Sequence, residues 1–251
     1  MRLAMLVFSA AVAAWPQCGA PKLEPTPDFA WLVGSLPDGA AAERYRWLRN
    51  GQPAESGKVP QLFLLHADDS TRTSAATAPL AEERVTFAPG RWGSALAVAD
   101  GGRLAYARQG HLDLNEGAIE MWVAPRADGA DKVYADLDHV LFLYRAANGD
   151  ELRVAQSRTI GVMYGGGNVR GQWQSAYGSQ ASTRGWAAGE WHHVVFTWSA
   201  AGNFMRFYVD GMRTADTNER HYWTPEATSD RFTLGTAQYL IDEVRIFSRP
   251  L

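Results

Sequence analysis

Two adjacent histidines, His192 and His193, lie between Trp191 and Trp198 in the segment GEWHHVVFTWS. Imidazole nitrogens bind zinc and other transition metals, and a histidine can also relay protons near neutral pH. The pair is therefore a candidate for a metal centre or a proton relay. The neighbouring valine, phenylalanine, threonine and tryptophan residues favour a β-strand, and the geometry of a strand tests this idea.

In an extended strand, successive side chains point to opposite faces. His193 then shares one face with Val195, whereas His192 shares the other face with Val194. The two imidazoles point apart and cannot chelate one ion together, so we expect hydrogen-bonded structural histidines in a central strand. No H-E-x-x-H or comparable zinc pattern joins the other histidines, which are His66, His111, His139 and His221.

The composition excludes some classes of partner. The chain has 251 residues, of which 46% are hydrophobic, and its formal net charge is −3. A core of ordinary size is available, but there is no excess of basic residues to neutralise a phosphate backbone. Nucleic acid is therefore not an expected partner.

The N-terminal sequence is typical of an export signal. Arg2 precedes an apolar run, Leu3–Ala14, which is too short to span a bilayer, and small residues follow it. We expect residues 1–20 to be a signal peptide, with a secreted, periplasmic or cell-surface product and no membrane span in the mature chain. Cys18 is the one cysteine, so no disulfide forms within the chain, and the residues before it do not favour a lipoprotein cleavage site.

The rest of the chain divides by composition. Residues 21–60 are rich in proline and turn-forming residues, which predicts an N-terminal extension or linker. In residues 61–251, short segments rich in valine, isoleucine, tyrosine, phenylalanine and tryptophan alternate with glycine, aspartate, asparagine and proline. Many short strands without crossover helices predict an all-β domain, an antiparallel two-sheet sandwich or jelly roll.

Six segments in order resemble the laminin-G-like, concanavalin A-like jelly-roll superfamily. The resemblance covers about residues 61–251, and it implies two packed antiparallel sheets with the first and last strands as neighbours. The fold hosts binding modules, enzymes and adhesion domains, so it does not imply one activity. The matching segments are LFLLHADDS, FAPGRWGSALAV, GAIEMWVAP, WHHVVFTW with FYVDG, FTLG, and IDEVRIFSRPL.

The resemblance also implies a structural calcium ion. Members of this superfamily often hold calcium between the acidic turn after the first strand and the final strand, and calcium prefers six to eight oxygen ligands. The matching positions are Asp68 and Asp242, with Asp69 as a weaker third candidate. Alternatively, Asp68 only caps a turn, and Asp242 only pairs with an arginine on the sheet surface.

A glycine-rich and aromatic segment, Tyr164–Trp186, is the candidate ligand-binding surface. Carbohydrate sites place aromatic faces against sugar rings and add amide and guanidinium donors. Each aromatic residue has an alternative role in the core. Tyr222 and Trp223 form another cluster that looks exposed. The candidate ligand-binding residues are Tyr164, Arg170, Trp173, Gln174, Tyr177 and Trp186.

We assign no catalytic residue. The laminarinase-type hydrolases of this fold carry E-x-D-x-x-E on one strand, and related lyases carry a Gln-x-His strand; neither occurs here. Glu116 and Glu120 are four residues apart, and Asp136 and Asp138 lie in a predicted loop.

Three functions therefore stay open. The first is a non-catalytic exported module that binds a glycan or a cell-surface protein. The second is a divergent glycoside hydrolase or polysaccharide lyase, and the third is a structural or adhesion domain.

Overall fold

The structure is a computed structural model, and it describes residues 23–25, 32–34, 48–49, 52–53, 61–131, 138–159, 161–177, 181–214 and 222–251. The predicted signal peptide, with Cys18, lies outside the described residues, as do Asp136 and His221. The chain divides into two compact units, Met1–Lys58 and Val59–Leu251. In the first unit, the described residues form two short antiparallel pairs: β1 (Leu23–Pro25) with β2 (Leu32–Gly34), and β3 (Leu48–Arg49) with β4 (Gln52–Pro53).

The second unit is built from antiparallel strands, and its described residues contain no α-helix. The prediction of an all-β domain is therefore confirmed. The strands are β5 (Gln61–Leu65), β6 (Ala81–Pro89), β7 (Ser94–Ala107), β8 (Glu116–Pro125), β9 (His139–Arg145), β10 (Glu151–Gln156), β11 (Met163–Val169), β12 (Gln172–Ala176), β13 (His192–Ser199), β14 (Phe204–Val209), β15 (Met212–Arg213), β16 (Arg231–Leu234) and β17 (Tyr239–Phe247).

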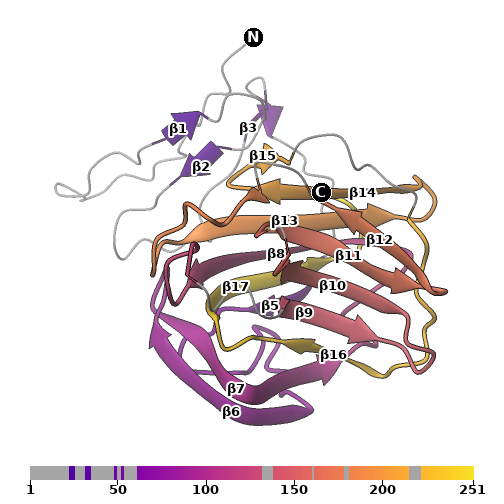
Figure 1. Cartoon of the computed structure of the whole chain (residues 1–251), viewed down its shortest axis with the longest axis horizontal. Helices are drawn as coiled ribbons and strands as arrows, with labels where there is room; N and C mark the ends of the chain where they lie inside the picture. Colours follow the sequence, from indigo (N-terminus) through magenta and orange to yellow (C-terminus); the bar gives the residue numbers. More distant parts are fainter. Residues whose placement is uncertain are drawn as a thin grey trace. The chain divides into compact units, whose positions relative to one another are not determined.

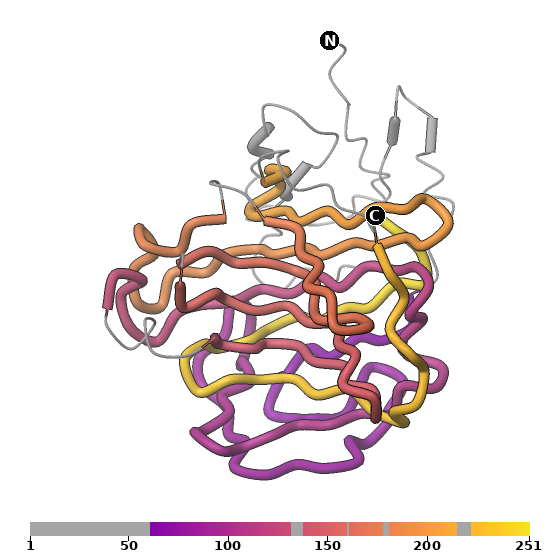
Figure 2. The backbone as a smooth tube through the Cα atoms, turned by 45° about the vertical axis from the view of Figure 1, so that its right-hand side comes forward, coloured from indigo at the N-terminus to yellow at the C-terminus, as the bar shows by residue number. Residues whose placement is uncertain are grey.

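Hydrogen bonds join these strands into one curled sheet in the order β12-β11-β10-β9-β16-β7-β17-β8-β13-β14-β15, with β5 on β17 and β6 on β7 (Figure 1). The sheet folds back on itself, so that β11 and β12 contact β14, and β11 contacts β13. Figure 2 shows the same backbone as a tube from a second direction. The result is a two-layer sandwich whose layers are joined through β7, which has 14 residues and pairs with both β16 and β17.

The first and last strands of the sandwich are neighbours, as the resemblance implies. Leu65 of β5 lies opposite Val244 of β17, and Gln61 lies opposite Phe247. A β-bulge interrupts β17 between Asp242 and Arg245. Such a bulge re-aims the local side chains, and it brings Asp242 under the loop that precedes β7.

The core lies between the two layers, and alternate residues of the central strands point into it. On β13, Val194, Phe196 and Trp198 are buried in the main hydrophobic cluster. His192 and His193 point to opposite sides of this strand, which confirms the expectation from its periodicity. The His192 ring stacks on Trp186 with centroids 3.8 Å apart, and its Nδ1 lies 2.8 Å from an Asp210 carboxylate oxygen.

The first half of the glycine-rich segment Tyr164–Trp186 belongs to a hairpin of β11 and β12. Arg170 and Gly171 both have positive φ, 52° and 73°, as a tight two-residue hairpin turn requires. Gly165 is needed for packing, because a Cβ atom there would lie 2.1 Å from Cδ2 of Phe196 in the facing layer. Gly165 therefore permits close contact between the layers, whereas Gly166 and Gly167 permit close approach of the neighbouring strands β12 and β10.

No helix in the described part of the chain has the length and apolar character needed to cross a membrane.

Candidate functional site

One outer surface of the sandwich carries aromatic and charged side chains from β10, β11 and β12. The strand register places Arg153 opposite Gly166, Tyr164 opposite Ala155 and Trp173 opposite Asn168. These side chains alternate with core residues such as Leu152 and Val154, so they point away from the core. We call this surface the Trp173 face; it comprises Asp138, Glu151, Arg153, Tyr164 and Trp173.

Trp173 is held in place although 46% of it is exposed. Its ring centroid lies 5.7 Å from that of Tyr164, and the Arg153 guanidinium carbon lies 5.1 Å from the indole centroid. The indole Nε1–H donates to Ser175 Oγ over 3.2 Å. Stacking, a cation–π contact and a hydrogen bond therefore fix an aromatic surface that is open to solvent.

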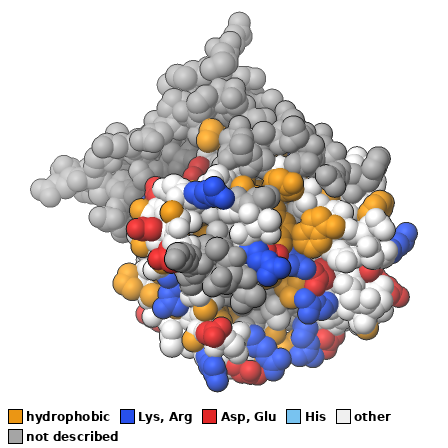
Figure 3. Space-filling view, viewed as in Figure 1, with side chains coloured by type: hydrophobic (Ala, Val, Ile, Leu, Met, Phe, Trp, Pro, Cys, Tyr) orange, Lys and Arg blue, Asp and Glu red, His pale blue; other side chains and the backbone are white. Residues whose placement is uncertain are grey.

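Charged groups surround this aromatic surface. Arg153 forms an ion pair with Glu151, and a longer one, 3.9 Å, with Asp138. The Tyr164 hydroxyl donates to Asp138 Oδ2 over 3.3 Å. Burial raises the pKa of Tyr164 well above its ordinary value, so the hydroxyl stays protonated and able to donate. Figure 3 shows basic and acidic side chains gathered beside hydrophobic ones on the face in view.

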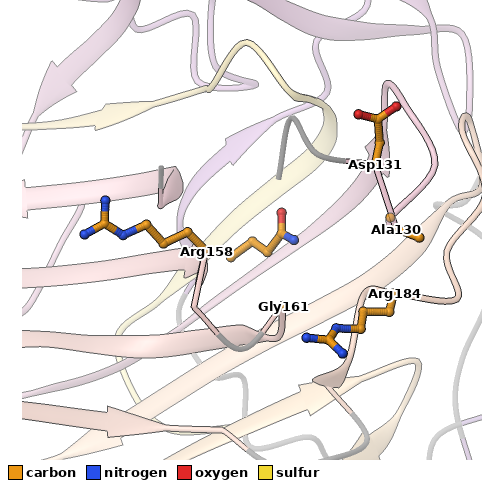
Figure 4. A pocket seen from close by; sticks show the side chains of 7 residues that line it. Ala130, Asp131, Arg158, Gly161 and Arg184 are labelled. Atoms are coloured by element: carbon orange, nitrogen blue, oxygen red, sulfur yellow. The ribbon is translucent and has the colours of Figure 1, made fainter. Parts of the chain in front are cut away.

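A pocket of about 310 Å³ adjoins the Trp173 face, and Gln156, Arg158 and Arg184 contribute to its lining. Figure 4 shows the two arginines reaching from separate segments beside Gly161. Asp138 connects the pocket to the Trp173 face, because its Oδ1 accepts a hydrogen bond of 3.0 Å from the Arg158 backbone N–H. The buried Gln156 side chain is fixed by Thr183 and Tyr239. The pocket thus has a hydrogen-bonded amide and two arginine residues in its lining.

The six predicted ligand-binding residues have different environments. Tyr164 and Trp173 meet on the Trp173 face. Arg170 occupies the β11–β12 turn, and Tyr177 is partly buried against the core. Gln174 is buried, and its amide exchanges two hydrogen bonds, 2.7 and 2.8 Å, with the backbone of Trp223. Trp186 is buried against His192.

Tyr222 and Trp223, the second aromatic cluster expected from the sequence, also have different environments. Tyr222 is buried and donates to the Leu114 carbonyl, whereas 40% of Trp223 is exposed beside β12. The structure adds Arg153 and Glu151 to the candidate site, which sequence reasoning missed. Their signal is the alternation in ELRVAQ, where these polar residues alternate with the buried Leu152 and Val154.

The three predicted calcium ligands all form hydrogen bonds to residues 90–94, the loop that follows β6 together with the first residue of β7. Asp242 is 0% exposed, and its Oδ2 accepts hydrogen bonds from the backbone N–H groups of Arg91 (2.9 Å) and Trp92 (3.2 Å). Asp68 Oδ1 accepts from the Ser94 N–H over 3.1 Å, and Asp69 Oδ1 accepts from the Ser94 hydroxyl over 2.8 Å. The acidic turn and the final strand therefore meet at this loop.

The donor chemistry of this acidic corner suits a hard cation, since it consists of carboxylate oxygens. Burial raises the pKa of Asp242 to about 6, because the hydrogen bonds described for it, from backbone N–H groups, only partly offset the cost of desolvating its charge. Within the described residues, no three His, Cys, Asp or Glu side chains are grouped closely enough to hold a metal ion. Further ligands would have to come from backbone carbonyls or water.

The carboxylates considered for catalysis do not form a hydrolase pair on β8. Glu116 and Glu120 share a strand face, and four residues of strand separate them by about 13 Å, more than the roughly 5–9.5 Å between glycosidase carboxylates. Glu120 is also bonded to Arg245 over 2.8 Å. Of the carboxylates considered for catalysis that the structure describes, Asp138 is the one on the Trp173 face.

The sequence profile of the concanavalin A-like lectin/glucanase superfamily matches residues 93–251. Among proteins with curated functions, none matches this chain significantly by sequence.

Solved structures share the fold at low sequence identity. Domain 4 of AbnA, a GH43 extracellular arabinanase from Geobacillus stearothermophilus in complex with arabinotriose, superposes with a TM-score of 0.60 at 14% identity, covering 76% of this chain and 94% of that chain. The receptor binding domain of botulinum neurotoxin type G superposes with a TM-score of 0.54 at 12% identity, covering 76% of this chain and 48% of that chain. A sialidase from Trypanosoma rangeli superposes with a TM-score of 0.51 at 16% identity, covering 81% of this chain and 33% of that chain.

Proposed function

Because the chain belongs to the concanavalin A-like lectin/glucanase superfamily, we propose that its sandwich is a non-catalytic, exported module that binds carbohydrate through the Trp173 face. The predicted signal peptide, residues 1–20, supports export to the periplasm, the cell surface or the medium. A glycan, free or carried by a cell-surface protein, is the proposed partner.

The observation that carries this proposal is the exposed and fixed indole of Trp173. An indole face packs against the C–H bonds of a sugar ring, and neighbouring polar groups then bond the hydroxyls. Arg153 supplies donors, the exposed Asp138 supplies acceptors, and Tyr164 holds both Trp173 and Asp138 in position, while the buried Glu151 holds Arg153. Since these groups are held by mutual contacts, binding costs little side-chain entropy.

The structural neighbours are consistent with this proposal. The arabinanase domain was solved with arabinotriose, and the neurotoxin domain binds a receptor. Their low identity supports the fold alone, so the argument for carbohydrate rests on the residues of the Trp173 face.

A glycan screen with Trp173 variants tests the proposal. We expect the wild-type protein to bind at least one neutral or acidic oligosaccharide, and Trp173→Ala to weaken that binding about 10- to 50-fold, since a central aromatic contact contributes about 1.4–2.3 kcal/mol. Trp173→Tyr should keep most of the affinity. Leu80→Ala, at an exposed apolar residue away from this face, is the control. If the wild-type protein binds no glycan in the screen, the proposal is contradicted.

A glycoside hydrolase is the second candidate, because Asp138 and Glu151 both contact Arg153 beside Tyr164. A glycosidase needs a carboxylic acid that reaches the glycosidic oxygen, whereas Glu151 is buried and both of its carboxylate oxygens are bonded, one to Arg145 and one to Arg153. The arrangement therefore favours binding over hydrolysis. The hydrolase would be supported if the wild-type protein released reducing ends from the sugars that it binds and if Asp138→Asn and Glu151→Gln lost this activity.

We further propose a structural calcium ion at the acidic corner, with Asp68 and Asp242 as ligands and Asp69 as a third. Calcium at 100 times its Kd would add about 2.7 kcal/mol, or about 5–10 °C in Tm for a domain of this size. We expect a shift of this order between EDTA and CaCl₂ in thermal melts of the wild-type protein, and a much smaller one in Asp242→Asn. Identical midpoints with and without calcium would exclude the ion.

A further inference from the structure

The other outer surface of the sandwich, on β8, β13 and β17, carries a second cluster of aromatic and polar side chains. Trp122 on β8 lies opposite His193 on β13 and opposite Asp242 on β17. Glu120, two residues earlier on the same face, lies opposite Arg245. The intervening residue, Met121, belongs to the core, so these side chains point away from it. We call this cluster the Trp92 surface; it comprises Arg91, Trp92, Glu120, Trp122 and His193.

Trp92 is the exposed member of this cluster. It lies in the loop of residues 90–94, and 51% of it is accessible. Its ring meets Trp122 edge to face, with centroids 5.4 Å apart and an interplanar angle of 89°. The Arg91 guanidinium carbon lies 4.8 Å from the Trp122 centroid and 5.5 Å from that of Trp92.

The backbone beneath this indole is fixed as well. The N–H groups of Arg91 and Trp92 both donate to the buried Asp242 carboxylate. A large apolar side chain is therefore held open to solvent by two hydrogen bonds and an aromatic contact. A single surface tryptophan needs no explanation, but a tryptophan fixed in this way offers a preorganised contact surface.

Polar groups that can bond hydroxyls lie beside Trp122. The His193 ring centroid is 5.1 Å from the Trp122 ring, and His193 Nε2 is 3.8 Å from Glu120 Oε2. Burial lowers the pKa of His193, which favours the neutral imidazole, a group with one donor and one acceptor. Glu120 adds acceptors, and Arg91 adds donors.

The charge of the cluster indicates the class of ligand. The guanidinium groups of Arg91 and Arg245 carry two positive charges, and two carboxylates, both hydrogen-bonded to Arg245, balance them. The cluster therefore has no excess of positive charge that would select an anion. An indole face with mixed donors and acceptors suits the ring and hydroxyls of an uncharged sugar. The charged side chains in this balance are Arg91, Arg245, Glu120 and Glu243; His193 and the buried Asp242 beneath the loop are further ionisable groups of the cluster and add no positive charge at neutral pH.

We propose that the Trp92 surface is a second carbohydrate-binding site, which takes one ring of a neutral saccharide. It shares no side chain with the Trp173 face and does not depend on the function proposed for that face.

Indole NMR signals of ¹⁵N-labelled protein can test the two sites separately. Spectra of Trp92→Phe and Trp173→Phe identify the two Nε1–H signals. The probes are arabinotriose, xylotriose, cellotriose, laminaritriose and mannotriose, with 3′-sialyllactose as the acidic comparison. We expect at least one neutral trisaccharide to move the Trp92 signal in a saturable way, and Arg91→Met and Glu120→Gln to weaken that titration at least fivefold.

The controls separate this proposal from the first one. In Trp173→Ala, the Trp92 titration should be unchanged, even if all binding at the Trp173 face is lost. If the chemical shift of the Trp92 indole does not change with any neutral probe, the proposal is overturned. A signal that moves with sialyllactose alone, or one that moves only while Trp173 is intact, also overturns it.

Discussion

Gly165→Ala is expected to destabilise the sandwich by about 3 kcal/mol, the upper end of the usual cost of overpacking a core. The new methyl group would lie 2.1 Å from Cδ2 and 2.2 Å from Cγ of Phe196. Phe196 is 1% exposed and packs against Trp198 and Phe207, so the ring has no free space to enter. The layers would have to separate locally, and β11 would move with Tyr164.

Urea or thermal unfolding measures this effect, and Gly185→Ala is the matched control. A Cβ atom at Gly185 meets nothing within 4 Å, and its φ is not in the left-handed region. That substitution should be neutral or slightly stabilising, because alanine restricts the unfolded chain. Similar losses in both variants would show that contact between the layers at β11 does not limit stability.

Asp150→Ala is the second substitution with a large expected effect, a loss of about 2–4 kcal/mol in the free energy of unfolding, because hydrogen bonds to a buried charge are lost together. Asp150 is buried, and its two carboxylate oxygens accept from the N–H groups of Arg170 (2.8 Å) and Glu226 (3.0 Å). It therefore ties the β11–β12 turn to the segment that follows Trp223.

The pH dependence of Asp150 has a defined sign. Burial raises the pKa of its carboxyl, but hydrogen bonds from Arg170, Glu226 and Asn148 outweigh this and hold the pKa below the ordinary value of 3.8. Asp150 thus contributes stability that is present above the pKa of the unfolded chain and is lost as the pH falls through the folded pKa.

Unfolding of Asp150→Ala between pH 3 and pH 7 measures both effects. The variant should differ most from the wild type at neutral pH and least in acid. Asp150→Asn should fall between them, since an amide oxygen still accepts one of the two hydrogen bonds. Asp100→Ala, at an exposed aspartate, is the control. A constant difference at all pH values would contradict the role of the charge.

Strands that are rich in strand-forming residues and bounded by turns could be predicted closely from the sequence. Two of the short strand-forming segments expected in residues 61–251 are HVLFLYR and ELRVAQ, and they coincide with β9 and β10 because turn-forming residues bound them. β6 and β12 were not recognised. β6 is largely exposed and polar, so it lacks an apolar signal, and β12 is hidden by the turn-forming residues around it. Hydrogen bonds from neighbouring strands, rather than local preference, define these elements.

The candidate sites could be predicted only in part, for a related reason. Trp173 and Trp186 are the same residue type in one segment, yet one is exposed and the other buried, because strand parity and the fold decide where each points. Arg153 joins Trp173 only through the pairing of β10, β11 and β12. The meeting of Asp68 and Asp242 at one loop was implied by the resemblance, and periodicity alone does not contain it.

The pairing of β5 with β17 also determines how the sandwich responds to force. Because Gln61 lies opposite Phe247 in an antiparallel pair, the backbone enters and leaves the sandwich at the same edge. A pull on these two ends loads the hydrogen bonds between them one at a time, as in a zipper, instead of shearing them all together. We therefore expect the first strand to peel away at a lower force than a strand pair that is loaded in shear.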